Sequence, residues 1–207
     1  MVPYVTGKDM VLDSSTRRNL ELTETMREKN KRGSLLWVLD KTKTAMGARL
    51  LRNYLEQPLI ELEEIEKRQE AIEELNANVI SREEIREYLN PVYDMERLSS
   101  RISYQSANPR DLISFKSSLS MIPPIKYLLN SFQLHDSLDE LEDVCSLIDR
   151  AIMDDPPLVI KDGGIIKEGY NEEIDRLRKA KTEGKQWLSE LEAREREKTG
   201  IKNLRIK

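Results

Sequence analysis

The sequence predicts an all-α protein: a multi-helical body, a small β-hairpin, and a long protruding helical arm that ends in a strand. Three observations predict this class. The composition, with 35% charged residues, 5% aromatic residues and only eight glycines and eight prolines among 207 residues, is typical of a mostly helical protein. Apolar residues recur three and four positions apart through most of the chain, which is helical spacing. Residues 171–198 keep that spacing without a proline and predict one long helix.

The chain begins with segments that carry weak signals. Residues 1–12 show no helical pattern, and we interpret them as a tail or as the end of an upstream connector. Residues 12–26 are open to two interpretations. Asp13 or Ser14 could cap a short helix, whereas the alternation in Asn-Leu-Glu-Leu is typical of a short strand.

Capping residues and prolines set the predicted boundaries of the helices in the body, residues 13–157. Thr42 or Thr44 would cap one helix, and Asn108 followed by proline would start another. Residues 81–84 match a capping box, and the two prolines after Ile122 would stop the helix before them. The predicted helices cover residues 35–40, 42–57, 61–79, 81–89, 93–102, 108–121, 125–132 and 138–153.

The third predicted domain, residues 158–207, follows a boundary at the Asp-Asp-Pro-Pro of residues 154–157. A hairpin is expected around Asp162-Gly163-Gly164. Asn171 would cap the long helix, and Gly200 would close it in a left-handed conformation. Leu204 and Ile206 then alternate with basic residues, which predicts a final strand. Since a lone strand cannot satisfy its backbone, we expect either that it pairs with an earlier strand or that its partner has been cut away.

Two predicted helices carry apolar stripes that we expect another element to cover. In the helix at 42–57 the stripe consists of Met46, Leu50, Leu51 and Tyr54. Along the long helix the residues four and three apart are Tyr170, Ile174, Leu177, Lys181, Gly184, Leu188 and Leu191. This second pattern is a single seam, like that of a coiled coil, and predicts packing against one partner helix.

The sequence offers little material for catalysis. His135 is its one histidine and is interpreted as a solvated loop residue, and Cys145 is its one cysteine and is interpreted as a small buried apolar residue. No Gly-x-x-x-x-Gly-Lys-Ser/Thr motif is present, so we expect no catalytic site, cofactor or metal in this part. No apolar run is long enough for a membrane span and no signal region opens the chain, so we expect a cytoplasmic protein.

Charge is unevenly distributed over the chain, whose net charge is -4. From residue 171 to the end there are 11 basic and 8 acidic residues, against 23 basic and 30 acidic residues before it. The last ten residues contain four cations and no acid, and these are the candidates for contact with a polyanion. No aromatic residue accompanies them, so any nucleic-acid contact is expected at the backbone and not at the bases. The candidates are Lys198, Lys202, Arg205 and Lys207.

Several long stretches together resemble the core, or lever, region and the start of the clamp of the bacterial MutS family of DNA mismatch-repair proteins. They begin with LDSSTRRNLELTE and LLWVLDKTKTAMGARLLRNYLEQPL, and the match continues in order to the end of the chain. The remaining stretches are VYDMERLSSRISYQSANPRDL, DDPPLVIKDGGIIKEGYNEEIDRLR and LEAREREKTGIKNLRIK.

The resemblance implies a role as part of a larger machine. The full-length protein would be a homodimeric, DNA-dependent ATPase that uses ATP and magnesium. It would encircle double-stranded DNA, detect a mispaired or looped-out base and signal to a downstream repair factor near the nucleoid. This chain would be a non-catalytic middle piece of it, since the Phe-x-Glu motif and the ATPase segments are missing. It would hold the DNA backbone without reading sequence, with weak or no binding on its own, and couple the clamp to the ATPase domains.

For the lever, the resemblance implies structural roles for five residues of the matching stretches. Gly47 is expected to allow close approach of helices, and the arginines are expected to satisfy helix caps or carboxylates. The five residues are Arg17, Arg18, Gly47, Arg49 and Arg110. We also expect the body to expose an apolar groove where returning helices belong. Two alternatives stay open: a helical scaffold or adaptor with a coiled-coil docking arm, and a MutS-like relative without mismatch recognition.

Overall fold

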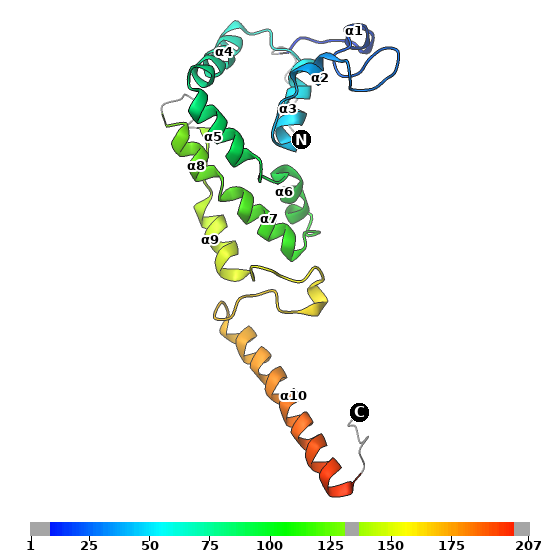
Figure 1. Cartoon of the computed structure of the whole chain (residues 1–207), viewed down its shortest axis with the longest axis vertical. Helices are drawn as coiled ribbons and strands as arrows, with labels where there is room; N and C mark the ends of the chain where they lie inside the picture. The colour runs from blue at the N-terminus through cyan, green and yellow to red at the C-terminus, as the bar shows by residue number, and fades with distance from the viewer. Residues whose placement is uncertain (1–8, 131–136, 201–207) are drawn as a thin grey trace.

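A computed structural model describes residues 9–130 and 137–200, and within these residues the protein is helical, with isolated β-bridges in place of a sheet. Figure 1 shows an elongated molecule in which the helices of the body lie above a single helix, α10, that projects away from them. In chain order the elements are α1 (Ser14–Asn19), α2 (Leu35–Leu39), α3 (Ala45–Glu56), α4 (Leu62–Ala77), α5 (Val79–Leu89), α6 (Met95–Ser103), α7 (Pro109–Leu119), α8 (Ile122–Leu128), α9 (Glu142–Ala151), the 3-10 helix η2 (Ile160–Asp162) and α10 (Glu172–Thr199).

Helix α7 is the centre of the body, because it packs against α6, α8 and α9 (Figure 1). Five of the buried apolar residues form two small clusters. One cluster joins α8 to α5 through Ile125 and Leu129, and the other joins α9 to α7 through Ile148, Ala151 and Ile152. The core is therefore thin and follows the length of the body.

Most helix starts follow the predicted caps. Thr44 accepts a hydrogen bond from the backbone N–H of Gly47, and Asn108 forms a capping box with Asp111. Of the two alternatives for residues 12–26, the helix is correct: Asp13 caps α1 by accepting from the N–H of Thr16 at 2.6 Å.

Several predicted boundaries are wrong; α9, for example, begins at Glu142 and not at 138, and two further cases have a clear local cause. Helix α5 begins at Val79 because Asn78, and not Ser81, is its cap; the Asn78 side chain accepts from the Ser81 N–H at 3.2 Å. The helix before the prolines does end, at Leu119, but the next helix, α8, begins at Ile122 and not at 125, so the prolines lie inside its first turn. Proline lacks an N–H, and at a first turn that N–H would have no intrahelical partner, so it fits there at little cost.

The predicted hairpin around Gly163-Gly164 does not form. Its first half contains η2 and is exposed, and its second half pairs with the end of α9 through an antiparallel bridge between Ile152 and Ile166. Ile165 and Ile166 pack against the cluster of Ile148, Ala151 and Ile152, which gives them a better apolar partner than the preceding strand would. The predicted final strand at Leu204–Ile206 lies outside the described residues.

The predicted stripe on α3 is not buried. Leu50 is 49% exposed and Tyr54 is 39% exposed, and α2 likewise exposes Trp37. This end of the body therefore presents apolar side chains to solvent, although Arg68 of α4 lies over the Tyr54 ring, with its guanidinium carbon 3.7 Å from the ring centroid.

Candidate nucleic-acid interface

Helix α10 forms an arm of 28 residues, about 42 Å long at ~1.5 Å per residue. Asn171 caps its start by accepting from the N–H groups of Glu173 and Ile174, and Gly200 ends it with φ of 69°. None of its residues is buried, and in Figure 1 no other helix lies along it. The predicted N-cap, helix and C-cap are confirmed, and the arm presents its side chains to solvent.

Several cations of the arm are neutralised by carboxylates on the next turn. Lys179 lies 3.8 Å from Glu183, Arg196 lies 3.2 Å from Glu192, and Lys198 lies 3.2 Å from Glu195. These are i,i+3 and i,i+4 pairs on an exposed helix, so each contributes only about 0.3–0.5 kcal/mol and can be broken by a stronger anion.

Lys181 and Lys185 differ from these cations. In the part of the chain that the structure describes, neither has a carboxylate within 4.0 Å. The sequence contains the reason: no acidic residue stands three or four positions from either lysine. This unneutralised pair was not predicted from the sequence, although the spacing of acids around each lysine reveals it.

Of the four predicted backbone contacts, the structure places only Lys198. It lies in the last turn of α10, two residues before Gly200, and its side chain is 64% exposed. Lys202, Arg205 and Lys207 lie outside the described residues. The tip of the arm therefore carries a cation that is accessible to solvent but shares its charge with Glu195.

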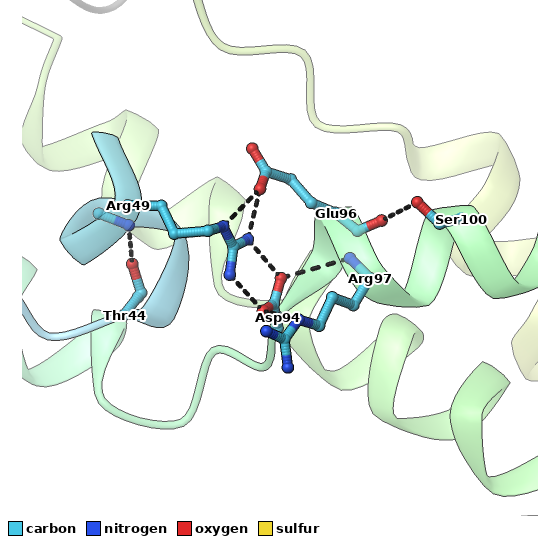
Figure 2. A network of polar contacts seen from close by, with 7 residues as sticks. Thr44, Arg49, Asp94, Glu96, Arg97 and Ser100 are labelled. Carbon is cyan, nitrogen blue, oxygen red and sulfur yellow. Dashed lines mark hydrogen bonds and ion pairs between the residues drawn. The ribbon is translucent and has the colours of Figure 1, made fainter. Parts of the chain in front are cut away.

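At the other end of the body, Arg49 joins α3 to α6 (Figure 2). Its Nη1 atom donates to Asp94 at 2.6 Å and its Nη2 atom donates to the other carboxylate oxygen at 2.8 Å, a bidentate pair. Its Nε atom donates to Glu96 at 3.1 Å. Asp94 also caps α6 by accepting from the backbone N–H of Arg97 at 3.3 Å. The hydrogen bonds from Arg49 lower the pKa of Asp94 below its usual value and raise the pKa of Arg49.

Replacing Arg49 with alanine should destabilise the protein by about 1–2 kcal/mol at neutral pH, since it leaves a largely enclosed carboxylate with fewer donors. The pKa of Asp94 is depressed in the folded state, so its stabilisation is present above the ordinary pKa of about 4 and is lost as the pH falls through the folded value. Urea unfolding at neutral pH and at about pH 2 should show the difference between variants shrinking in acid.

A matched control for this prediction is Arg52→Ala, because Arg52 lies on the same helix and pairs with Glu56 over one exposed turn. Its effect should stay below about 0.5 kcal/mol at either pH. An Arg49→Ala effect that is equally small, or that persists unchanged in acid, would contradict the role given to the pair.

The other family-motif residues occupy separate places. Arg110 donates from Nε to the carbonyl oxygen of Pro156 at 3.0 Å, which ties α7 to the segment after α9. Arg17 lies 3.9 Å from Glu56, and Arg18 is exposed, with no ion pair in the described residues. The three atoms nearest to a Cβ at Gly47 belong to Thr42 and Thr44, just before its own helix. The structure thus does not gather these residues into one site.

The described residues do not provide a second kind of site. Among them, no group of three or more His, Cys, Asp or Glu side chains could hold a metal ion. Cys145 is half-buried at the edge of a pocket of about 400 Å³, with its sulfur 3.8 Å from the hydroxyl of Ser120. His135 lies outside the described residues. Among the described helices, none combines the length and the apolar character needed to span a membrane.

Comparison with known proteins points to one family. The family model described as MutS domain III matches residues 15–206. A protein from Lachnoclostridium phytofermentans named DNA mismatch repair protein MutS is 67% identical over 100% of this chain and 23% of its own length. Proteins of the same name from Acetivibrio thermocellus and Caldanaerobacter subterraneus are 55% and 56% identical, over 95% and 98% of this chain. The chain spans less than a quarter of the length of these relatives.

Proposed function

Because this chain belongs to the MutS domain III family, we propose that it is a non-catalytic part of a DNA mismatch-repair protein, in which its arm holds the backbone of duplex DNA. The body would then be the lever that couples this clamp to ATPase domains elsewhere in the longer protein. The matched domain is domain III of the family and not its ATPase domain.

One observation carries the proposal beyond family membership. The arm is a single exposed helix with a cation in its last turn, and the sequence beyond that turn adds three further cations and no acid. Cations without aromatic neighbours fit phosphates, whose positions are the same for every DNA sequence. The geometry therefore supports backbone holding without base readout.

The remaining properties belong to the longer protein. We propose that it acts as a homodimer on double-stranded DNA, uses ATP and magnesium, and signals to a downstream repair factor in the cytoplasm at the nucleoid. The sequence of this chain has no phosphate-binding loop, so nucleotide would be held by other segments.

A second candidate function rests on the apolar residues of the arm. Leu177 is 61% exposed, Trp187 is 62% exposed and Leu188 is 42% exposed. Such a stripe suits a helical scaffold or adaptor that docks a partner helix by coiled-coil packing. A MutS-like relative without mismatch recognition fits the same observations, and a Phe-x-Glu motif in the upstream part of the longer protein would exclude it.

The test of the proposal is fluorescence anisotropy of a short labelled homoduplex titrated with this chain from 50 to 200 mM salt. If Lys202, Arg205 and Lys207 each neutralise a phosphate and Lys198, paired with Glu195, does so in part, the slope of log affinity against log salt lies between about -2.7 and -3.6, and affinity falls roughly 40- to 150-fold over that range. A chain that ends at Glu197 should not bind, and a mismatched duplex should bind like the homoduplex. Binding that survives the truncation would contradict backbone holding by the tip of the arm.

A further inference from the structure

The arm leaves the body through a short turn whose geometry suggests a hinge. After Lys167 the chain makes a turn at residues 168–170, with Gly169 at φ of 84°, and then enters α10. Glycine is the residue type that adopts this region of φ without strain, and such a position readily absorbs a change in backbone angle. The direction of a 28-residue helix depends on how firmly these three residues are held.

The chain before this turn is fixed to the body. The N–H of Met153 donates to the Ile165 carbonyl at 2.8 Å, and the N–H of Lys167 donates to the Ala151 carbonyl at 2.8 Å. Lys167 also lies 3.1 Å from the carboxylate of Asp154. Ile165 and Ile166 pack into the cluster at the end of α9. Residues up to Lys167 therefore move with the body, and the arm can change its direction only by rotation at residues after Lys167.

Two side chains of α10 reach back across the turn. Arg178 donates from Nη2 to the carbonyl oxygen of Ile166 at 2.9 Å, on the body side of the hinge. Asp175 accepts from the backbone N–H of Gly169 at 2.7 Å, within the hinge itself. The two side chains also bind each other, with Arg178 Nη1 lying 3.2 Å from Asp175 Oδ1. Their exposed fractions of 38% and 26% mean that both are partly shielded from water.

We propose that Asp175 and Arg178 form a clip that closes the hinge at residues 168–170 and fixes the direction of the arm relative to the body. Each bond uses a charged side chain against a backbone group, which is stronger than a neutral hydrogen bond. The bonds span residues 166 to 178 and so include every residue of the turn. With the clip closed, the turn and the first two turns of α10 form one unit with α9. That this fixed direction presents the basic tip to DNA rests on the proposed function. The clip itself does not depend on that function.

The clip can be tested by double electron–electron resonance between spin labels on the body and on the arm. In a Cys145→Ser background, labels on Glu84→Cys of α5 and Ser189→Cys of α10 report the distance across the hinge; both positions are exposed. Arg178→Ala should widen the distance distribution roughly twofold, because a freed hinge samples many directions. Asp175→Asn weakens the hydrogen bonds of this side chain with the Gly169 N–H and with Arg178. It should therefore widen the distance distribution less than Arg178→Ala does.

The matched control is Arg176→Ala. Arg176 stands two residues earlier on the same exposed helix and has no ion pair in the described residues, so its removal should leave the distribution unchanged. Circular dichroism should show that all variants keep their helix content, since alanine favours helix. A distribution that is as narrow in Arg178→Ala as in the parent, or that widens equally in Arg176→Ala, would overturn the clip. No DNA is present in this experiment, so its outcome is independent of the test of the proposed function.

Discussion

Replacing Leu119 with alanine is expected to destabilise the body by about 2–3 kcal/mol, a large share of the stability of a small domain. Leu119 is 2% exposed and lies at the end of α7, the helix that packs against α6, α8 and α9. It also lines the pocket of about 400 Å³ beside Pro123 and Cys145. Because the lost side chain would enlarge a space that is already open to water, the cost should fall in the lower part of the range for Leu-to-Ala changes.

Leu147→Ala is the matched control for this prediction. Leu147 lies on α9, the helix packed against α7, but it is 48% exposed, so the same chemical change should cost well under 1 kcal/mol. Urea unfolding followed by circular dichroism would measure both variants, with the slope against urea unchanged and only the midpoint shifted. Equal midpoints for the two variants would show that α7 is not the centre of the core.

The parts of the fold that the sequence predicts well depend on neighbouring residues only. Thr44, Asn108 and Asn171 each accept hydrogen bonds from backbone N–H groups two or three residues away. The capping residue and the helix that it starts therefore lie in the same short stretch of sequence. Gly200 likewise closes α10 in the left-handed conformation that favours glycine. Such local signals are sufficient for helix positions because nothing distant competes with them.

The failed hairpin prediction comes from competition with distant residues, whereas the wrong boundaries of α5 and α8 have local causes. Gly163 and Gly164 adopt positive φ, as a tight turn requires, but the strand after them pairs with the end of α9 and not with the strand before them. The glycines did not produce the predicted hairpin, because the contact of Ile165 and Ile166 with the end of α9 decided the pairing. Apolar spacing on α3 correctly predicted a helix but could not show whether another element covers the stripe.

The features of the candidate site likewise fall into two groups, those set by neighbouring residues and those set by distant ones. The exposed cations of the arm follow from sequence, since charge and helical spacing determine which lysines have an acid nearby. The Arg49–Asp94 pair joins residues 45 positions apart, and the bond from Arg178 to the Ile166 carbonyl depends on how the linker folds back. Neither contact can be read from spacing along the chain.

The pairing of Lys198 with Glu195 leads to a prediction about DNA affinity. Glu195→Gln should tighten binding of a homoduplex about two- to threefold at 50 mM salt, because Lys198 no longer shares its charge with a carboxylate before it meets a phosphate. The slope of log affinity against log salt should become steeper by up to about 0.9, the value for one further phosphate neutralised. Conversely, Lys198→Ala should weaken binding less than the loss of any one of Lys202, Arg205 or Lys207, which stand five or more positions from any acid in the sequence.

Two controls separate this effect from a general change in net charge. Glu190→Gln removes the same charge from the arm, but Glu190 accepts a hydrogen bond from Gln186 and pairs with no lysine in the described residues. It should therefore leave the salt slope unchanged even if affinity rises slightly. The double variant Lys181→Ala, Lys185→Ala removes two unneutralised cations far from the tip and should also keep the slope. If Glu195→Gln and Glu190→Gln give the same salt slope, Lys198 does not contact a phosphate. If the double variant flattens the slope by about 1.8, the DNA lies along the middle of the arm and not at its tip.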